Sequence, residues 1–498
     1  MYTRFKHDTN GNGHGSLSSS STTDDVRLHH VQMPHWQVGT KQILQGSDYA
    51  LVEPTSKIES VPTQVEFELP TKKSILFGSM SKFRIVGGFT KLEGADTVWK
   101  TVPSGEAAKV LLAPFWFEML IKEISVFHNN YKVATSSETR FIAPFLHAYL
   151  YTHMDPKVKA MLCPQLGHPG YCVPAKNEKW TLVSEGYKEY IKTAFADAEF
   201  AFEYVPLFLF PFFQGPNFMV NEEGIPRILH MPTLGRIQIR FTFHDSQDHI
   251  FNRIVNNTDK YRFAFTEFKM IVEQARFNPS MERSIQAVKK SLPYPGVTRL
   301  QLVEQVPNSS SAYKTRFQDI VMPESIFIFC LDKTVASGTY KFSGEKSSNI
   351  FRDHNIQSVE LSFAGMRLSI HEPHLGMYRE DEMDSKAYFD HRFIPPFGIF
   401  QNKELLTHAA VTEGSIETAF PHLYFPLVKG PDRQRIVPSL DNGGSIMKKA
   451  DLEIDFKFKA SNSAENCIYC IYCCYTDVNM VYDNKNRVFY SPYLQYMN

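Results

Sequence analysis

The sequence lacks a net charge and any long apolar run. Its 53 Lys and Arg residues balance 53 Asp and Glu residues, which removes the broad electrostatic argument for nucleic-acid binding, sequence-specific binding included. The richest apolar stretches, Leu111–Leu120 and Val205–Phe213, contain prolines and fall short of the roughly 20 residues that span a bilayer. The first ten residues are polar and lack the apolar core of a signal peptide. We therefore expect a soluble protein that is not secreted through a signal peptide.

Cysteine is scarce and unevenly placed. Three of the seven cysteines are isolated and four crowd near the end of the chain, at Cys467, Cys470, Cys473 and Cys474. This is not a disulfide framework and favours synthesis in a reducing compartment. Thiols at this spacing could share zinc or an iron–sulfur cluster, but the segment is rich in strand formers. A strand would point Cys467 and Cys473 to one face and Cys470 and Cys474 to the other. The sequence therefore predicts small buried thiols and no metal site.

Motifs of common catalytic and cofactor sites are also missing. The sequence contains no phosphate-binding Gly-x-x-x-x-Gly-Lys-Ser/Thr loop and no Gly-x-Ser-x-Gly nucleophile elbow. The run His371-Glu-Pro-His374 spaces its histidines by three and contains a proline, unlike the helix of a metalloprotease. The glycines of Asn10–Gly15 follow no strand and precede no helix. We expect a protein that is not an enzyme, with no catalytic, cofactor-binding or metal-binding residues and no cofactor.

Aromatic residues and proline are abundant. The chain of 498 residues contains 40 Phe, 23 Tyr and 29 Pro but only 4 Trp, which favours strands joined by irregular loops. Its length predicts more than one domain or one large two-part unit. Residues 1–45 are rich in Gly, Ser, Thr, His and Asn and cannot bury enough apolar surface to fold, so they are predicted to form a flexible arm.

From about residue 60, apolar and polar residues alternate as in strands with one buried face. The predicted strands of the first half are Val65–Leu69, Phe83–Ile85, Met119–Phe127, Val205–Phe213, Ile237–Phe243 and Phe263–Val272. Two segments between them, Glu138–Met154 and Glu185–Phe202, are predicted to be helical inserts.

The second half repeats this order. Its predicted strands are Val297–Val306, Ile320–Cys330, Val359–Phe363, Met366–Ile370, His422–Leu427, Leu452–Phe458 and Cys467–Tyr475, with an acidic helical insert at Glu380–Tyr388. His422–Leu427 pairs with Val205–Phe213, and Leu452–Phe458 with Ile237–Phe243, at an offset of about 215 residues, so two copies of one all-β unit explain the pattern. We predict an all-β fold with helical inserts, made of two tandem eight-stranded jelly rolls. The first spans residues 46–275, residues 276–296 form a connector, and the second spans 297–498.

The chain resembles the double jelly-roll major capsid proteins of eukaryotic DNA viruses and virus-like elements, in the Polinton or Maverick, adintovirus and virophage group. The pattern covers about residues 60–490. The resemblance rests on Val65–Pro70 with Phe83–Ile85, Pro114–Phe127 leading into His128-Asn129-Asn130 and the helical region from Glu138, Leu234–Phe241, and Val478–Asp483.

This resemblance implies a structural protein made in the host cytoplasm and located in the virion. Three copies are expected to form a pseudo-hexagonal capsomer, and capsomers to tile an icosahedral shell together with minor capsid or penton proteins; an internal membrane beneath the shell is left open. The inserts Ser136–Phe202 and His371–Ala410 are expected to shape the exterior or the trimer contacts.

Two other functions use jelly rolls. A carbohydrate-binding or host-attachment protein should expose clustered aromatic residues, but the chain has only Trp36, Trp99, Trp116 and Trp180, and Trp116 lies in a predicted core strand. A cupin-like metal enzyme would need about three His and one Glu on facing strands.

Overall fold

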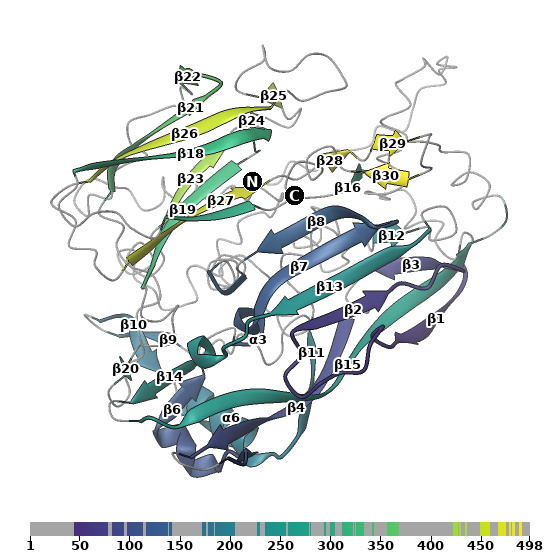
Figure 1. The fold of residues 1–498 in the computed structure, drawn as a ribbon, viewed down its shortest axis with the longest axis vertical. Helices are drawn as coiled ribbons and strands as arrows, with labels where there is room; N and C mark the ends of the chain where they lie inside the picture. The colour runs from purple at the N-terminus through teal and green to yellow at the C-terminus, as the bar shows by residue number, and fades with distance from the viewer. Residues whose placement is uncertain are drawn as a thin grey trace, which may run out of the picture.

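The computed structural model describes residues 44–277 with gaps, the longest at 142–171 and 205–226. It also describes the strands of residues 293–490, where the longest gap is 368–421. Figure 1 shows two β sandwiches, one from the purple to teal strands of the first half and one from the green and yellow strands of the second.

The first sandwich consists of two antiparallel sheets. In the larger sheet, β15 (Lys260–Phe277) pairs with β1 (Leu44–Val52), β3 (Ser74–Phe77) and β4 (Lys82–Leu92). Beyond them, β4 pairs with β5 (Lys100–Thr101) and β11 (Phe200–Tyr204), and β3 pairs with β12 (Arg227–Leu229). The smaller sheet has the order β2 (Gln64–Glu68), β13 (Ile237–Phe243), β7 (Ile121–His128), β8 (Tyr131–Ser137).

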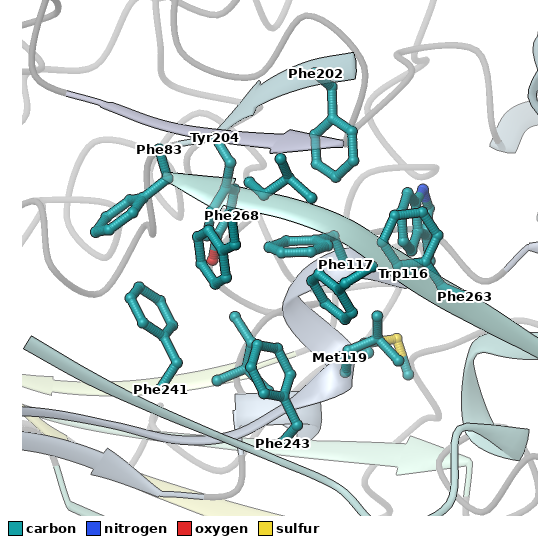
Figure 2. Close-up of a cluster of buried hydrophobic side chains, with 14 of the residues drawn as sticks. Phe83, Trp116, Phe117, Met119, Phe202, Tyr204, Phe241, Phe243, Phe263 and Phe268 are labelled. Atoms are coloured by element: carbon teal, nitrogen blue, oxygen red, sulfur yellow. The ribbon is translucent and has the colours of Figure 1, made fainter. Parts of the chain in front are cut away.

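Aromatic side chains fill the space between these two sheets. The rings of Phe67, Phe83, Phe241 and Phe268 lie with centroids 4.9–6.1 Å apart, and Figure 2 shows several of them pointing toward one another from different strands. Strand alternation places these residues on the inner face, and edge-to-face ring contacts add to the energy of burial. The abundance of Phe in the sequence is therefore explained by core packing.

Helices are few among the described residues, and they only partly match the predictions. The predicted helical insert Glu185–Phe202 is confirmed for α6 (Glu185–Ala196), but Phe200–Phe202 belongs to strand β11. Helix spacing ends where Phe200, Phe202 and Tyr204 begin to alternate, and pairing with β4 then satisfies the backbone. Residues 172–183 contain the hairpin of β9 (Cys172–Ala175) and β10 (Glu178–Val183). Most of Glu138–Met154 lies outside the described residues.

A short helix, α3 (Trp116–Leu120), precedes β7 and is buried along its whole length. The prediction that Trp116 lies in a core strand was therefore right about the core and wrong about the strand, and the predicted strand Met119–Phe127 begins two residues later, at Ile121. Trp116 packs on Phe89 and Phe263, with ring centroids 5.0 and 5.1 Å away. The helix thus packs Trp116 against rings that β4 and β15 contribute to the core.

The second sandwich also has two antiparallel sheets. One has the order β17 (Arg299–Val303), β27 (Cys467–Cys474), β19 (Ser325–Asp332), β23 (His422–Pro426), and the other the order β18 (Ala312–Val321), β26 (Lys449–Phe458), β21 (Ile356–Phe363), β22 (Met366–Arg367). Their facing side chains form a separate core that includes Phe317, Ile328, Ile454 and Ile471. The predicted run Ile320–Cys330 is divided between β18 and β19, with Pro323, which has no N–H to donate, between them.

Both sandwiches connect their strands in the same order. In chain order, β1, β2, β4, β7, β8, β11, β13 and β15 correspond to β17, β18, β19, β21, β22, β23, β26 and β27. In each sandwich the first, eighth, third and sixth strands form one sheet, and the second, seventh, fourth and fifth form the other. This confirms two eight-stranded jelly rolls in tandem.

The equivalence corrects one predicted strand pair and supports another. The counterpart of β23 is β11, not Val205–Phe213, which lies outside the described residues. The pairing of Ile237–Phe243 with Leu452–Phe458 is confirmed, because β13 and β26 take the same place in their sheets. The domain bounds remain a prediction.

Short strands complete the described part. These are β6 (Val110–Leu112), β14 (Phe251–Ile254), β16 (Pro293–Tyr294), β20 (Lys341–Phe342), β24 (Val428–Lys429), β25 (Gln434–Arg435), β28 (Val478–Asn479), β29 (Val481–Asp483) and β30 (Val488–Tyr490). Of the helices in the described ranges, none has the length and apolarity to cross a bilayer.

Candidate assembly interface

Within the described residues, contacts at three places join the two sandwiches of one chain. Edge strand β17 of the second sandwich packs beside edge strand β8 of the first. β20, from the second half, adds in parallel to β14 of the first, which also pairs with β6. The C-terminal hairpin of β29 and β30 reaches back to β7 and β8. Contacts at separate places resist hinge motion, so the two sandwiches form a block suited to serve as one building unit.

The sheet of β17, β27, β19 and β23 is covered on both faces. Tyr469, Ile471 and Cys473 of β27 point into the core of the second sandwich. The intervening residues Cys470 and Tyr472 point the opposite way and are also buried. Strands covered on both sides read as continuous apolar runs, which explains the sequence Cys467–Cys474.

Two cysteines of this strand, Cys470 and Cys473, have described side chains, and both are buried as the sequence predicts. Cys470 and Cys473 lie on opposite faces of β27, and both are buried as reduced thiols, as is Cys330 of β19. Burial raises the pKa of the Cys470 thiol well above its ordinary value, which disfavours the thiolate that binds metals. Within the described ranges, no group of three or more His, Cys, Asp or Glu side chains is placed to hold a metal ion.

Among the described residues, the equivalent sheet of the first sandwich ends at the edge strand β1. On β1, Ala50 and Val52 pack against the core, whereas Tyr49 and Leu51 point outward and are 61% and 55% exposed. β1 pairs with β15 on one side only. An edge strand that exposes large apolar side chains is a site of association.

Ion pairs cover the outer face of the sheet that contains β18 and β26. Lys314 and Arg316 on β18 pair with Glu453 and Asp451 on β26, and Arg367 on β22 pairs with Glu360 on β21 at 3.0 Å. The ammonium of Lys314 lowers the pKa of Glu453. Exposed pairs of this kind stabilise a fold little, and here they keep the face polar.

The equivalent face of the first sandwich carries the opposite arrangement. Here the edge strand β2 supplies acids, and the bases lie on the neighbouring β13 or directly before it, since Glu66 pairs with Arg240 at 2.8 Å and Glu68 with Arg236 at 2.9 Å. The Arg240 guanidinium also lies over the ring of Phe127, 4.4 Å from its centroid. The two jelly rolls thus keep the same backbone plan while their surface charges differ.

A buried ionic network closes one end of the first sandwich. The Nζ atom of Lys91 lies 3.1 Å from Glu106 and 3.3 Å from Asp259, and the Tyr261 hydroxyl donates to Glu106 at 2.8 Å. Burial opposes the charged form of Lys91, but hydrogen bonds to Glu93, Glu106 and Asp259 outweigh it and raise its pKa. Lys91 and Glu106 each lie beside opposite charges, so the network supports the structure. Neither Lys91 nor Glu106 is left as an acid or base for catalysis.

A half-buried and a buried histidine, His244 and His249, form a second polar group. The rings of His244 and His249 meet edge to face with centroids 4.8 Å apart, and His249 Nε2 donates to the carbonyl of Met119 in α3 at 2.5 Å. His249 belongs to the 3-10 helix η4 (Asp248–Ile250), which leads directly into β14. The histidine pair therefore lies next to β14, the strand of the first sandwich that pairs with β20.

Of the remaining sequence candidates, only some lie within the described residues. Trp99 is covered by the Arg262 guanidinium, 4.0 Å from its ring centroid, and Trp116 is buried, so neither offers a sugar platform. Asn10–Gly15, His371-Glu-Pro-His374, Trp36 and the insert His371–Ala410 lie outside the described residues. The insert Ser136–Phe202 begins within β8 and includes α6 and the hairpin β9–β10.

Comparison with solved structures agrees with this architecture. A chain of the Sputnik virophage, whose structure was determined by cryo-EM at 3.5 Å, aligns with a TM-score of 0.54 and 11% identity over 90% of this chain and 89% of that one. The chain has the double jelly-roll fold. Two less similar structures are the mavirus major capsid protein, with a TM-score of 0.47, 12% identity and 90% of each chain covered, and the Faustovirus major capsid protein, with 0.45, 10%, 87% of this chain and 90% of that one. No protein-family model and no curated protein sequence matches the chain.

Sequence reasoning missed the exposed edge of this double jelly roll. The alternating pattern was taken to start at about residue 60, whereas β1 begins at Leu44. The four residues Tyr49-Ala-Leu-Val52 give too short a signal by themselves. Only the sheet order shows that two of them face the core and two face outward.

Proposed function

We propose that this protein is the major capsid protein of a DNA virus or a virus-like element, and that its role is structural. The observation that carries the proposal is the duplicated jelly roll with one strand order in both halves, joined into a single block. An enzyme or a lectin needs only one such sandwich, together with a site lined by catalytic or ligand-binding side chains. A block of two sandwiches of like plan is what a lattice of sixfold outline needs, because three chains supply six similar units.

Three copies are therefore proposed to form a ring-shaped capsomer, which is the partner that the first assembly step requires. Most soluble oligomers close by rotation, and a head-to-tail contact between unlike surfaces generates such a ring. Capsomers then tile an icosahedral shell with minor capsid or penton proteins, and the protein is located in the virion. Residues 1–45 act as an arm, residues 276–296 connect the sandwiches, and the inserts at 136–202 and 371–410 shape the exterior or the contacts.

The experiment is to express the full chain, measure its mass in solution by light scattering, and image it by negative-stain microscopy. A mass of three chains with a hexagonal outline, or closed shells, supports the proposal. A strictly monomeric protein at high concentration contradicts it. Tight binding to a glycan array by such a monomer would favour the attachment function instead.

A further inference from the structure

The two jelly rolls carry equivalent edge strands, and one equivalent pair is in contact within the chain. β1 and β17 are the first strands of their sandwiches, and each lies at an edge beside the last strand. β8 and β22 are the fifth strands, and each lies at the edge of the other sheet. Both follow tight turns with two consecutive residues at positive φ, Asn129-Asn130 and Ala364-Gly365. The turns support the equivalence independently of the pairing.

Within one chain, β17 of the second sandwich packs beside β8 of the first. The equivalent contact between β1 and β22 is not made in the chain: Figure 1 shows these two strands at opposite extremes of the molecule. The contact between a first strand and a fifth strand is thus made inside the subunit by β17 and β8. The equivalent strands β1 and β22 do not contact each other within the chain.

The exposed apolar residues mark these same two strands. Four large hydrophobic side chains of the described part are exposed: Tyr49, Leu51, Val98 and Met366. Two are on β1 and one, Met366, is on β22, where it is 40% exposed. Three of the four lie on these two edge strands, a concentration that isolated surface residues do not explain.

Charges on the two strands are complementary as well. Asp48 on β1 and Glu53 directly after it flank Tyr49 and Leu51, and both carboxylates remain largely exposed in their pairs with Lys73 and Lys269. Next to Met366 on β22 is Arg367, whose side chain is 73% exposed although it pairs with Glu360. On β1, acids thus flank the apolar residues Tyr49 and Leu51, whereas on β22 a base lies beside the apolar Met366.

We propose that β1 of one copy docks against β22 of a second copy of this chain, repeating between subunits the contact that β17 and β8 make within one. The inference rests on the proposed function, because it names the surface through which capsomer subunits meet. The contact is head to tail, so each copy uses β1 toward one neighbour and β22 toward the other. Three such contacts close a ring of six sandwiches.

The test uses cysteine pairs in the full-length chain under mild oxidation. The double variant Leu51→Cys with Met366→Cys is expected to give covalently linked dimers and trimers on a denaturing gel, and each single variant should stay unlinked. The matched control combines Val98→Cys with Met366→Cys, because Val98 is equally exposed but lies on neither strand; it should stay unlinked. In a second measurement, Leu51→Asp should weaken self-association at least about 10-fold by light scattering, whereas Val98→Asp should leave it unchanged.

The outcomes separate this inference from the proposed function. If the wild type forms trimers but the Leu51 and Met366 cysteines do not link and Leu51→Asp assembles normally, the docking of β1 on β22 is wrong and the capsid function stands. If the wild type remains monomeric at high concentration, both are wrong. Since Leu51 and Met366 are exposed, circular dichroism should show that the variants fold.

Discussion

Acidification should weaken the first jelly roll through the pair of His244 and His249. The pKa of His249 is lowered to about 4, mainly by burial and also by the nearby Arg140 guanidinium, against the opposing effects of the hydrogen bond to the Met119 carbonyl and of Asp248. Burial also lowers the pKa of His244 to about 3, together with the charges of His249, Arg140 and Lys122. Both rings are therefore neutral in the folded protein at neutral pH, packed between α3 and η4.

The size of the effect follows from the difference between folded and unfolded chains. An unfolded histidine takes up a proton as the pH falls through its ordinary pKa of 6.5, whereas folded His249 does so only near pH 4. The unfolded state binds more protons between these values, so stability is greatest above pH 6.5 and is lost as the pH falls toward 4. Between pH 7 and pH 5, His249 alone should contribute a loss of about 2 kcal/mol in the free energy of unfolding.

The substitution that isolates this effect is His249→Gln, since its amide can still donate to the Met119 carbonyl but does not titrate. Urea unfolding of wild type and variant should be followed at several pH values by tryptophan fluorescence, to which Trp116 contributes from the helix that His249 contacts. Carboxylates titrate in both proteins and cancel in the comparison. If both proteins lose the same stability between pH 7 and pH 5, the argument from the histidine pair is refuted.

Two substitutions and one reactivity measurement test the packing. Gly88→Ala should destabilise the first sandwich by about 1–3 kcal/mol, since a Cβ there would lie 2.0 Å from the backbone oxygen of Ala198; chemical denaturation measures this. Lys91→Met should cost about 3 kcal/mol because it leaves the buried Glu106 without one of its charge partners, and the same measurement checks it. The Cys470 thiol should react with a thiol reagent only after unfolding, because it is buried and its pKa is raised.

Matched variants show what would contradict these expectations. Gly105→Ala adds a Cβ with no heavy atom within 4 Å and should leave stability unchanged. Lys314→Met removes an exposed partner of Glu453 and should change stability by less than about 1 kcal/mol. If Gly105→Ala lost as much stability as Gly88→Ala, steric overlap would not be the cause. If Lys314→Met lost as much as Lys91→Met, buried charge would not be the cause. Rapid reaction of all seven cysteines in the native protein would show that β27 is not the buried strand described.

Local patterns in the sequence were sufficient to predict the class of fold and several elements. Alternation identified β2, β13 and β26, and apolar residues at helical spacing identified α6. The cysteine cluster was assigned to a buried strand because Ile and Tyr surround the thiols. These predictions succeed because side chains on a strand alternate between faces whatever the partner strand is.

Other features depend on residues far apart in the chain. The predicted helix extends to Phe202 because the alternation of Phe200, Phe202 and Tyr204 is too short to mark a strand by itself; pairing with β4, more than a hundred residues earlier, makes this segment a strand. The histidine pair draws on α3 and η4, and Lys91 finds its partners on three separate segments. No spacing rule predicts such groups, because loops of any length can bring their members together.

By itself, the sequence determined that this is a chain of two similar β units with buried thiols and an aromatic core, since composition and period act locally. Only the tertiary structure decided which edges are used and which remain open. β17 and β1 have the same place in their sheets, yet one is packed beside β8 and the other exposes Tyr49 and Leu51. Whether an apolar edge residue is buried depends on what the fold places beside it, and the residue's own neighbours in sequence do not carry that information.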